Sequence, residues 1–123
     1  MGKFTLNQTK TGFNFKLIAA NGQEIGASQV YASLNSCKNG VLSVKKNAPL
    51  AASEDQTVEG FEKLKNPKFQ IYTDKAGEFR FRLLAKNGKN ILSSEGYKTK
   101  KSCLNGISSV AKNAPEAKVE KKF

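Results

Sequence analysis

Apolar residues alternate with polar residues in several short segments, a pattern typical of strands with one buried face. The strand predicted for residues 13–20 has one face made of Phe13, Phe15, Leu17 and Ala19, and another made of Asn14, Lys16, Ile18 and Ala20. Shorter runs predict a strand before it, through residues 4–6, and a strand after it, through Ile25. Asn21-Gly22 precedes the third strand and predicts a type I′ turn, in which both residues have positive φ. These segments together predict a three-stranded meander.

The spacing of apolar residues then becomes helical. Ser33 is a suitable N-cap, and one apolar stripe follows it, made of Cys37, Val41, Val44 and Ala48. Gly40 also lies on this stripe. Because glycine costs ~1 kcal/mol relative to alanine inside a helix, its presence indicates that the helix backbone lies close to the sheet. We expect the helix to end at a left-handed Asn47, with Ala48 extended before the proline.

An internal repeat extends the predicted meander and helix to the second half of the chain. Residues 13–51 align with residues 79–117 at a constant offset of 66, without a gap, and 20 of these 39 positions are identical. The second copy therefore repeats the predicted elements of the first. Its members include Phe69 and Ile71 in the first strand, the Asn87-Gly88 turn, Ile91 in the third strand, the N-cap Thr99, the stripe of Cys103, Ile107, Val110 and Ala114, and the end Asn113-Ala114-Pro115.

The segment that joins the repeats differs from them in charge. Residues 52–66 hold four acids and two lysines, a net charge of −2, against +5 before them and +8 after them. Val58, Phe61 and Leu64 predict a fourth strand in this segment, and the alternating tail of residues 117–123 predicts its counterpart. We expect a first repeat at residues 3–64 and a second at residues 67–123. Because a unit of roughly 50–60 residues buries little surface alone, both should share one core, in a single compact domain spanning residues 1–123.

Two long runs carry a resemblance to a known family. The first repeat contains FNFKLIAANGQEIGASQVY followed by SVKKNAP, and the second contains FRFRLLAKNGKNILSSEGY followed by SVAKNAP. These runs resemble the tandem-repeat YegP-like proteins, a bacterial family of unknown function, over nearly the whole chain. The resemblance implies β-β-β-α-β units that combine into one sheet, exchange their last strands and pack their helices against it. We therefore expect an α+β fold with pseudo-twofold symmetry, a single antiparallel sheet and two helices on one face. No activity, cofactor or catalytic residue follows from the resemblance.

Composition narrows the function mainly by exclusion. With 38% hydrophobic and 25% charged residues, the chain of 123 residues can form a packed core. It has no His and two Cys, which excludes His-based triads, His-ligated metals and zinc fingers. No signal peptide or membrane-spanning run is apparent, so we expect a cytoplasmic protein without a membrane partner. The net charge of +11 is the one global feature that suggests a kind of partner, an anionic one.

Catalytic chemistry has few candidates. Cys37 and Cys103 lie one turn into each predicted helix, where a thiol pKa can be lowered. They also lie on the apolar stripes without a His, which favours a role as small buried hydrophobes. Tyr31 and Tyr97 end the third strands, where packing is favoured over a functional phenol. No pair of carboxylates recurs in both repeats. We therefore expect no catalytic, cofactor-binding or metal-binding residues, and a protein that is not an enzyme.

The outward face of the predicted meanders combines positive charge with apolar and aromatic surface. The candidate polyanion-binding residues are Lys16, Tyr72, Arg80, Arg82 and Lys86. Single-stranded nucleic acid binders use such combinations. The alternative is a solvated face that only keeps the protein soluble.

The start of the second predicted helix is a candidate anion site. Its residues are Lys98, Thr99, Lys100 and Lys101, where the first repeat has Ala32, Ser33, Leu34 and Asn35. Free N–H groups beside lysines can hold an anion, so we expect phosphate or sulfate to bind weakly near Thr99 and not near Ser33. The alternative is that the lysines extend into water and their charge is screened.

Three functions remain open at this point. The favoured one is non-enzymatic binding of nucleic acid or another polyanion through the open sheet face. The alternative is a protein-interaction module that uses sheet edges or helices, for which an acidic protein is one candidate partner. The third is a small-ligand or thiol-dependent enzyme. We expect a monomer with internal pseudo-twofold symmetry, and its physiological partner is unknown.

Overall fold

The computed structural model describes residues 2–123, and within them the chain forms eight strands and two α-helices, each helix followed by a short 3-10 turn (η). The first repeat contains β1 (Lys3–Gln8), β2 (Phe13–Ile18), β3 (Glu24–Ala27), α1 (Leu34–Asn47), η1 (Ala48–Leu50) and β4 (Ala52–Asp55). The second repeat contains β5 (Lys68–Thr73), β6 (Phe79–Leu84), β7 (Asn90–Ser93), α2 (Lys100–Asn113), η2 (Ala114–Glu116) and β8 (Lys118–Lys121). The predicted order of elements in both repeats is confirmed.

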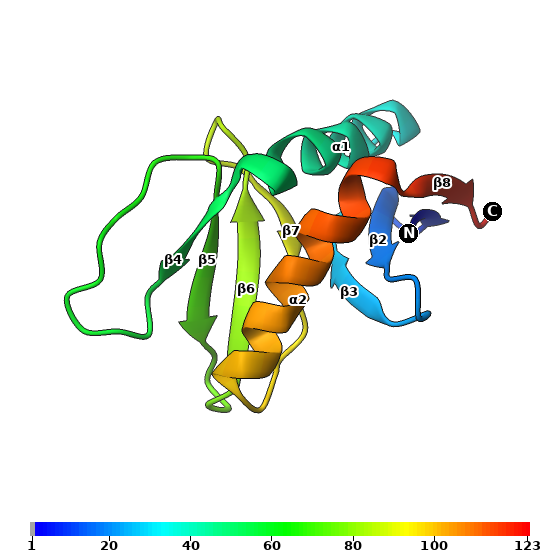
Figure 1. Cartoon of the computed structure of the whole chain (residues 1–123). Coiled ribbons are helices and arrows are strands. Elements are labelled where there is room, and N and C mark those ends of the chain that lie inside the picture. Colours follow the sequence, from blue (N-terminus) through cyan, green and yellow to red (C-terminus); the bar gives the residue numbers. More distant parts are fainter. Residues whose placement is uncertain (1) are drawn as a thin grey trace.

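The strands of residues 2–123 form one sheet in the order β4-β5-β6-β7-β3-β2-β1-β8, and both helices lie on the same side of it (Figure 1). The two meanders meet at the centre, where β3 pairs with β7 through Ala27 and Ser93. The last strand of each repeat pairs with the first strand of the other, β8 with β1 and β4 with β5. The expected strand exchange is therefore confirmed.

One detail of the predicted sheet is corrected: it is mixed and not antiparallel throughout. The strands within each meander pair antiparallel, whereas β4 and β8 run parallel to their neighbours. The connection explains the difference. β4 and β5 are joined by residues 56–67, a connection long enough for parallel strands, and β1 and β8 are the first and last strands of the chain, so no tight hairpin forces either pair to be antiparallel.

The core lies between the sheet and the helices and contains the residues that the alternation places inward. Phe4, Phe15, Phe69 and Phe81 are at most 1% exposed. Their rings meet edge to face in equivalent pairs, with centroids 5.7 Å apart for Phe4 and Phe15 and 5.8 Å apart for Phe69 and Phe81. The helical stripes complete the core with Cys37, Val41, Val44 and Ala48 and with Cys103, Ile107, Val110 and Ala114.

The N-caps are confirmed, but the predicted type I′ turns are wrong. The Ser33 side chain accepts a hydrogen bond from the Ser36 N–H, and the Thr99 side chain accepts one from the Ser102 N–H. Gly22 has a φ of 87° and Gly88 of 84°, but no other residue type in the described chain has positive φ. Each turn is a type I turn followed by glycine, a three-residue connection. The Asn21 side chain accepts a hydrogen bond from the Gln23 N–H (3.0 Å), which fixes the turn without a left-handed asparagine.

The predicted helix ends also differ from the structure. Asn47 has a φ of −87° and Ala48 a φ of −55°, so neither is left-handed or extended. The Asn47 amide side chain donates to the Ser43 carbonyl (2.8 Å), one turn earlier in the same helix. Pro49 lies in the first turn of η1, where its missing N–H is tolerated. The α-helix therefore ends two residues before the proline, and the chain continues through a tighter 3-10 turn.

The predicted fourth strand exists but lies at β4 and not around residues 58–64. Val58 and Phe61 are 50% and 36% exposed. They belong to a long loop, residues 56–67, at the β4 end of the sheet (Figure 1). β4 buries an acid instead, because Glu54 is only 1% exposed. A hydrophobic pattern could not reveal a strand whose buried residue is charged.

Glu54 forms a buried ion pair with Lys68 of β5. The Lys68 Nζ lies 2.6 Å from the Glu54 Oε2, and the two side chains are 11% and 1% exposed. The Leu64 N–H (2.8 Å), the Gln56 amide (2.9 Å) and the Gln70 amide (3.1 Å) also donate to this carboxylate. Burial alone would raise the pKa of Glu54, but these hydrogen bonds outweigh it and lower the pKa to about 2. The pair joins the exchanged strand, the loop and β5.

We predict that Glu54→Gln lowers the free energy of unfolding at pH 7 by about 3 kcal/mol, because it leaves the Lys68 ammonium buried without a counterion. The pKa of Glu54 is about 2 in the folded protein against an ordinary value of 4.5. Its stabilisation is therefore complete above pH 4.5 and lost as the pH falls toward 2. Urea unfolding between pH 7 and pH 3 should show a shallower acid loss in the variant. Glu59→Gln, on the exposed part of the loop, is the control and should match the wild type.

The glycines of the helical stripe allow a close approach, as predicted. A Cβ on Gly40 would lie 2.5 Å from the Tyr31 hydroxyl and 2.9 Å from the Phe15 ring. The equivalent Gly106 has the same environment, 2.5 Å from the Tyr97 hydroxyl and 3.0 Å from the Phe81 ring. The tyrosine at the strand–helix corner thus fills the space that a side chain on the helix would need.

We predict that Gly40→Ala lowers the free energy of unfolding by about 1 kcal/mol, because overpacking outweighs the gain in helix propensity. Chemical denaturation should measure the loss. Tyr31→Phe in the Gly40→Ala protein should recover part of it, since the hydroxyl is the nearest atom to the new methyl group. A Gly40→Ala protein more stable than the wild type would contradict the close approach.

Candidate functional site

The side of the sheet without helices carries a continuous row of side chains across its centre, here called the central row. Strand register places Lys16 beside Ala27, Ala27 beside Ser93, Ser93 beside Arg82 and Arg82 beside Gln70. Neighbouring strands lie ~4.8 Å apart, so the backbones of Lys16 and Arg82 are separated by about 14 Å. These two cations occupy equivalent positions in the repeats, on either side of the boundary between them.

Arg82 is the cation of the central row without a carboxylate partner in residues 2–123. Its Nε donates to the Gln70 Oε1 (2.6 Å), and its guanidinium carbon lies 4.5 Å from the centre of the Tyr72 ring. This contact is a cation–π interaction. The hydrogen bond and the ring together hold a planar cation in a fixed orientation. A guanidinium held in this way can stack on a nucleobase and contact a phosphate.

The other predicted cations of this face are paired with acids. The Arg80 Nε lies 2.6 Å from the Asp74 Oδ2, and the hydrogen bond from Arg80 lowers the pKa of Asp74 below its usual range. Lys16 lies 3.4 Å from the Glu24 carboxylate. Both pairs are partly exposed, so they contribute little to stability. They do reduce the net charge that the face can offer to an anion.

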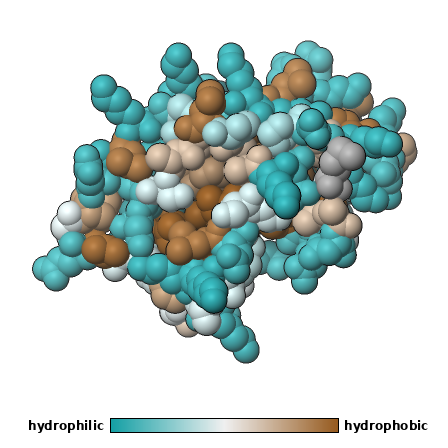
Figure 2. All heavy atoms as spheres, viewed as in Figure 1, coloured by the Kyte–Doolittle hydropathy of each residue, from teal (hydrophilic) through white to brown (hydrophobic). Residues whose placement is uncertain are grey.

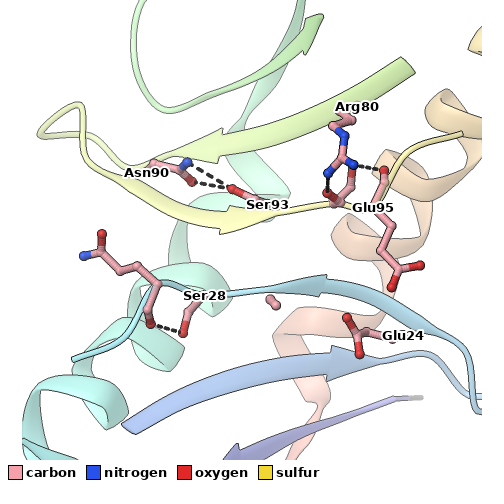
Figure 3. A pocket seen from close by; sticks show the side chains of 9 residues that line it. Glu24, Ser28, Arg80, Asn90, Ser93 and Glu95 are labelled. Carbon is pink, nitrogen blue, oxygen red and sulfur yellow. Dashed lines mark hydrogen bonds between the residues drawn. The ribbon is translucent and has the colours of Figure 1, made fainter. Parts of the chain in front are cut away.

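A hollow of about 550 Å³ lies at the boundary between the repeats, beside the central row (Figure 3). It is present because the side chains at the β3–β7 contact, Ala27 and Ser93, are small. Its polar lining includes Glu24, Ser28, Arg80, Asn90, Ser93 and Glu95. The Asn90 amide donates to the Ser93 hydroxyl (3.0 Å). The hollow therefore offers hydrogen-bond donors and acceptors from both repeats, with one cation and two acids.

The structure brings four of the five predicted polyanion-binding residues to this face and separates the fifth. Lys16, Tyr72, Arg80 and Arg82 lie on strands with their side chains opposite the core residues. Lys86 follows the end of β6 and lines a groove with Lys46 of α1, on the helical side. Its assignment to the open face is therefore wrong. The chain leaves the strand after Leu84, so the alternation no longer applies.

At the start of α2, the predicted anion site, one of the lysines already binds a carboxylate of the protein itself. The Lys100 Nζ lies 2.8 Å from the Asp55 Oδ2 of β4. Burial alone would raise the pKa of Asp55, but the bonds from Lys100 and Thr57 lower it. Lys98 and Lys101 form no ion pair within residues 2–123. Phosphate binding near Thr99 stays a prediction, with Asp55 competing for one of its lysines.

The cysteines and the corner tyrosines pack in the core region. Cys37 and Cys103 are 0% exposed. Burial raises the pKa of both thiols, that of Cys103 to about 11. The Tyr31 ring stacks on Phe15 at a centroid distance of 6.2 Å, and burial raises the pKa of its hydroxyl. These environments favour packing over nucleophilic chemistry.

No cluster of three or more Cys, Asp or Glu side chains in residues 2–123 could hold a metal ion. No helix in this range is long and apolar enough to cross a membrane.

Sequence reasoning missed the hollow and the acids beside the cations. The hollow depends on the pairing of β3 with β7. These strands lie in different repeats, and no sequence pattern indicates that they are neighbours. The pair between Lys100 and Asp55 joins residues 45 positions apart. The pair between Arg80 and Asp74 is closer in sequence, and the position of Asp74 in the turn before β6 could have suggested it.

Fold and face together define a class: a tandem-repeat α+β protein whose halves exchange strands and leave one side of the sheet free of helices. The family model described as "Domain of unknown function (DUF1508)" matches residues 9–55 and 74–120, one match in each repeat, and the chain belongs to this family. That description assigns no function. The expected family resemblance is therefore confirmed.

Known relatives agree with this assignment. A UPF0339 protein of Bordetella pertussis is 39% identical over 116 residues, which cover 94% of this chain and 91% of that protein. A UPF0339 protein of Stutzerimonas stutzeri is 67% identical over 55 residues, 44% of this chain and half of that protein. The solution structure of the Escherichia coli protein yegP, of unknown function, superposes with a TM-score of 0.80 at 31% identity, covering 98% of this chain and 92% of that one.

We predict that the thiols of the folded protein do not react with an aromatic disulfide reagent until the protein unfolds. The reason is that both are buried and have raised pKa values. Absorbance of the released thiolate measures the rate. Ser108→Cys, at an exposed position of α2, is the matched control and should react at once. Rapid reaction of a native cysteine would reopen a thiol-dependent function.

Proposed function

We propose that the protein is a non-enzymatic binding module that takes a short single-stranded nucleic acid on the helix-free face of the sheet. The observation that carries the proposal is the arrangement of Arg82, which Gln70 and Tyr72 hold flat and which has no acid partner in the described chain. A net charge of +11 supports it by attracting polyanions over longer distances.

The geometry favours single strands over duplexes. Unpaired bases can stack on aromatic rings and on guanidinium planes, and each such contact is worth about 1–3 kcal/mol. The hollow beside the central row has a volume of about 550 Å³, larger than a nucleobase, and its lining includes the amide of Asn90 and the hydroxyl of Ser93, with the carboxylates of Glu24 and Glu95 beside them. A strand that crosses the sheet from Arg82 toward Lys16 would place a base near this hollow.

The paired acids limit the electrostatic share of binding. Arg80 and Lys16 already have carboxylate partners, so we expect only one or two phosphates to be neutralised. Binding of single strands depends on salt with a slope of about −0.7 per phosphate contact. Recognition would rest on stacking more than on charge.

Sheet edges are a weaker basis for function. β8 is exposed along its four residues, but it is short and has lysines at both ends. Short, lysine-rich edges oppose the addition of a further strand. The alternative of a protein-interaction module therefore depends more on the helical side.

We predict that Arg82→Ala weakens binding of a fluorescent eight-nucleotide oligothymidine at least about fivefold, because a stacking contact is lost. Fluorescence anisotropy at low salt measures the affinity. Lys38→Ala is the matched control, since it removes one positive charge from an exposed position of α1 on the other side of the sheet. It should change the affinity less than twofold. The wild-type logarithmic salt slope should lie between about −0.7 and −1.4.

Two results would contradict the proposal. One is an absence of binding by the wild-type protein at low salt. The other is an equal loss in Arg82→Ala and Lys38→Ala, which would show that only the total charge matters.

A further inference from the structure

Two equivalent grooves lie on the helical side of the molecule, each between a helix and the hairpin turn of the other repeat. The α1 groove has a volume of about 500 Å³ and lies between α1 and the β6–β7 turn. The α2 groove has a volume of about 370 Å³ and lies between α2 and the β2–β3 turn. Each of the eight residues that line the α2 groove is the equivalent, at offset 66, of a residue that lines the α1 groove.

Some groove residues are identical in the two repeats although the fold does not require them. Six of the eight equivalent positions are identical in the two repeats. Asn39 and its equivalent Asn105 are exposed, and their side chains make no hydrogen bond within residues 2–123. Lys46 and Lys112 are likewise exposed and form no ion pair there. Capping and core packing explain most other identities between the repeats, but they do not explain the identity of Asn39 with Asn105 or of Lys46 with Lys112.

The polar groups of the α1 groove are mainly hydrogen-bond donors. The Asn87 Oδ1 already accepts the Lys89 N–H (3.0 Å), which leaves the amide N–H groups of Asn87 to donate. The Ser43 Oγ accepts from Asn47 (3.1 Å), which leaves its own proton. Lys46 and Lys86 add two ammonium groups, and neither groove is lined by Asp or Glu. Such a groove is complementary to a ligand that carries acceptors and negative charge.

The α1 groove also has an apolar border that the α2 groove lacks. Leu42 is 61% exposed and Leu50 71% exposed, where the second repeat has Ser108 and Glu116. Seen from the helical side, the surface shows hydrophobic side chains among hydrophilic ones (Figure 2). The same groove has Lys86 where the α2 groove has Ala20. The α1 groove is thus both more basic and more apolar than the α2 groove.

We propose that the α1 groove binds an extended acidic segment of a partner protein, with its carboxylates on Lys46, Lys86 and the asparagine amides and an aliphatic side chain against Leu42 and Leu50. The apolar border favours a peptide, because a nucleic acid strand has no aliphatic side chains to pack against it. The α2 groove, with Lys112 alone and no leucine, is the weaker copy. This site is on the opposite side of the sheet from the central row and does not depend on it.

The test uses an acetylated hexapeptide of alternating Glu and Leu, titrated into the full-length isotope-labelled protein. We expect saturable shifts of the backbone amides of residues 39–46 and 86–87, and smaller shifts at residues 105–112 and 20–21. The double variant Lys46→Ala/Lys86→Ala should weaken binding about tenfold, through the loss of two charge pairs. The double variant Lys38→Ala/Lys45→Ala removes the same charge from α1 outside the groove and should stay within twofold.

Other outcomes overturn the proposal. Equal losses in the two double variants would show that only the net charge attracts the peptide. Equal binding of the corresponding Gln-Leu peptide would exclude charge complementarity. Shifts of the same residues with oligothymidine but not with the peptide would assign the groove to nucleic acid. Arg82→Ala should leave peptide binding unchanged, so failure of the groove and failure of the sheet face are distinguishable.

Discussion

The exchange of the last strands is the constraint on which the rest of the structure depends. The ladder between the two meanders, β3 with β7, consists of the single residue pair Ala27 and Ser93. β4 and β8 instead form four-residue parallel ladders with the first strand of the other repeat. To reach those positions the chain must cross the sheet, and that crossing is the helix. Strand exchange therefore sets the two-helix layer, the weak central contact with its hollow, and the grooves between each helix and the opposite hairpin.

Much of the fold could be predicted because its signals are local. Alternation identified the meanders, helical spacing identified the stripes, and Ser33 and Thr99 identified the helix starts. The failures occur where a neighbour decides the outcome. β4 is held by the pair between Glu54 and Lys68 on the other repeat, which apolar spacing could not show. The Asn-Gly turns depend on a side-chain bond that keeps asparagine in the right-handed region.

The candidate face was predictable to the extent that strand alternation decides which side a residue faces. Gln70, Tyr72 and Arg82 lie together because register places facing residues of β5 and β6 on one side. The acids that compensate Arg80 and Lys16 were not predicted, and they change the chemistry of the face. Alternation does not decide the side of Lys86, because the strand ends two residues earlier, at Leu84. A count of cations therefore overstates the charge that this face offers.

The pseudo-twofold arrangement treats the two candidate surfaces differently. The groove on the helical side exists twice, once in each repeat, whereas the central row crosses the boundary between the repeats once and contains equivalent positions from both. The second repeat carries a net charge of +8 against +5 for residues 1–51. Its arginines reach the open face from β6, whereas Lys86 reaches the helical side from the turn that follows. The sheet separates the two, so cations gained by the same repeat serve opposite sides. Because no strand or side chain is shared between Arg82 and the pair of Lys46 and Lys86, the two surfaces can change their ligands independently.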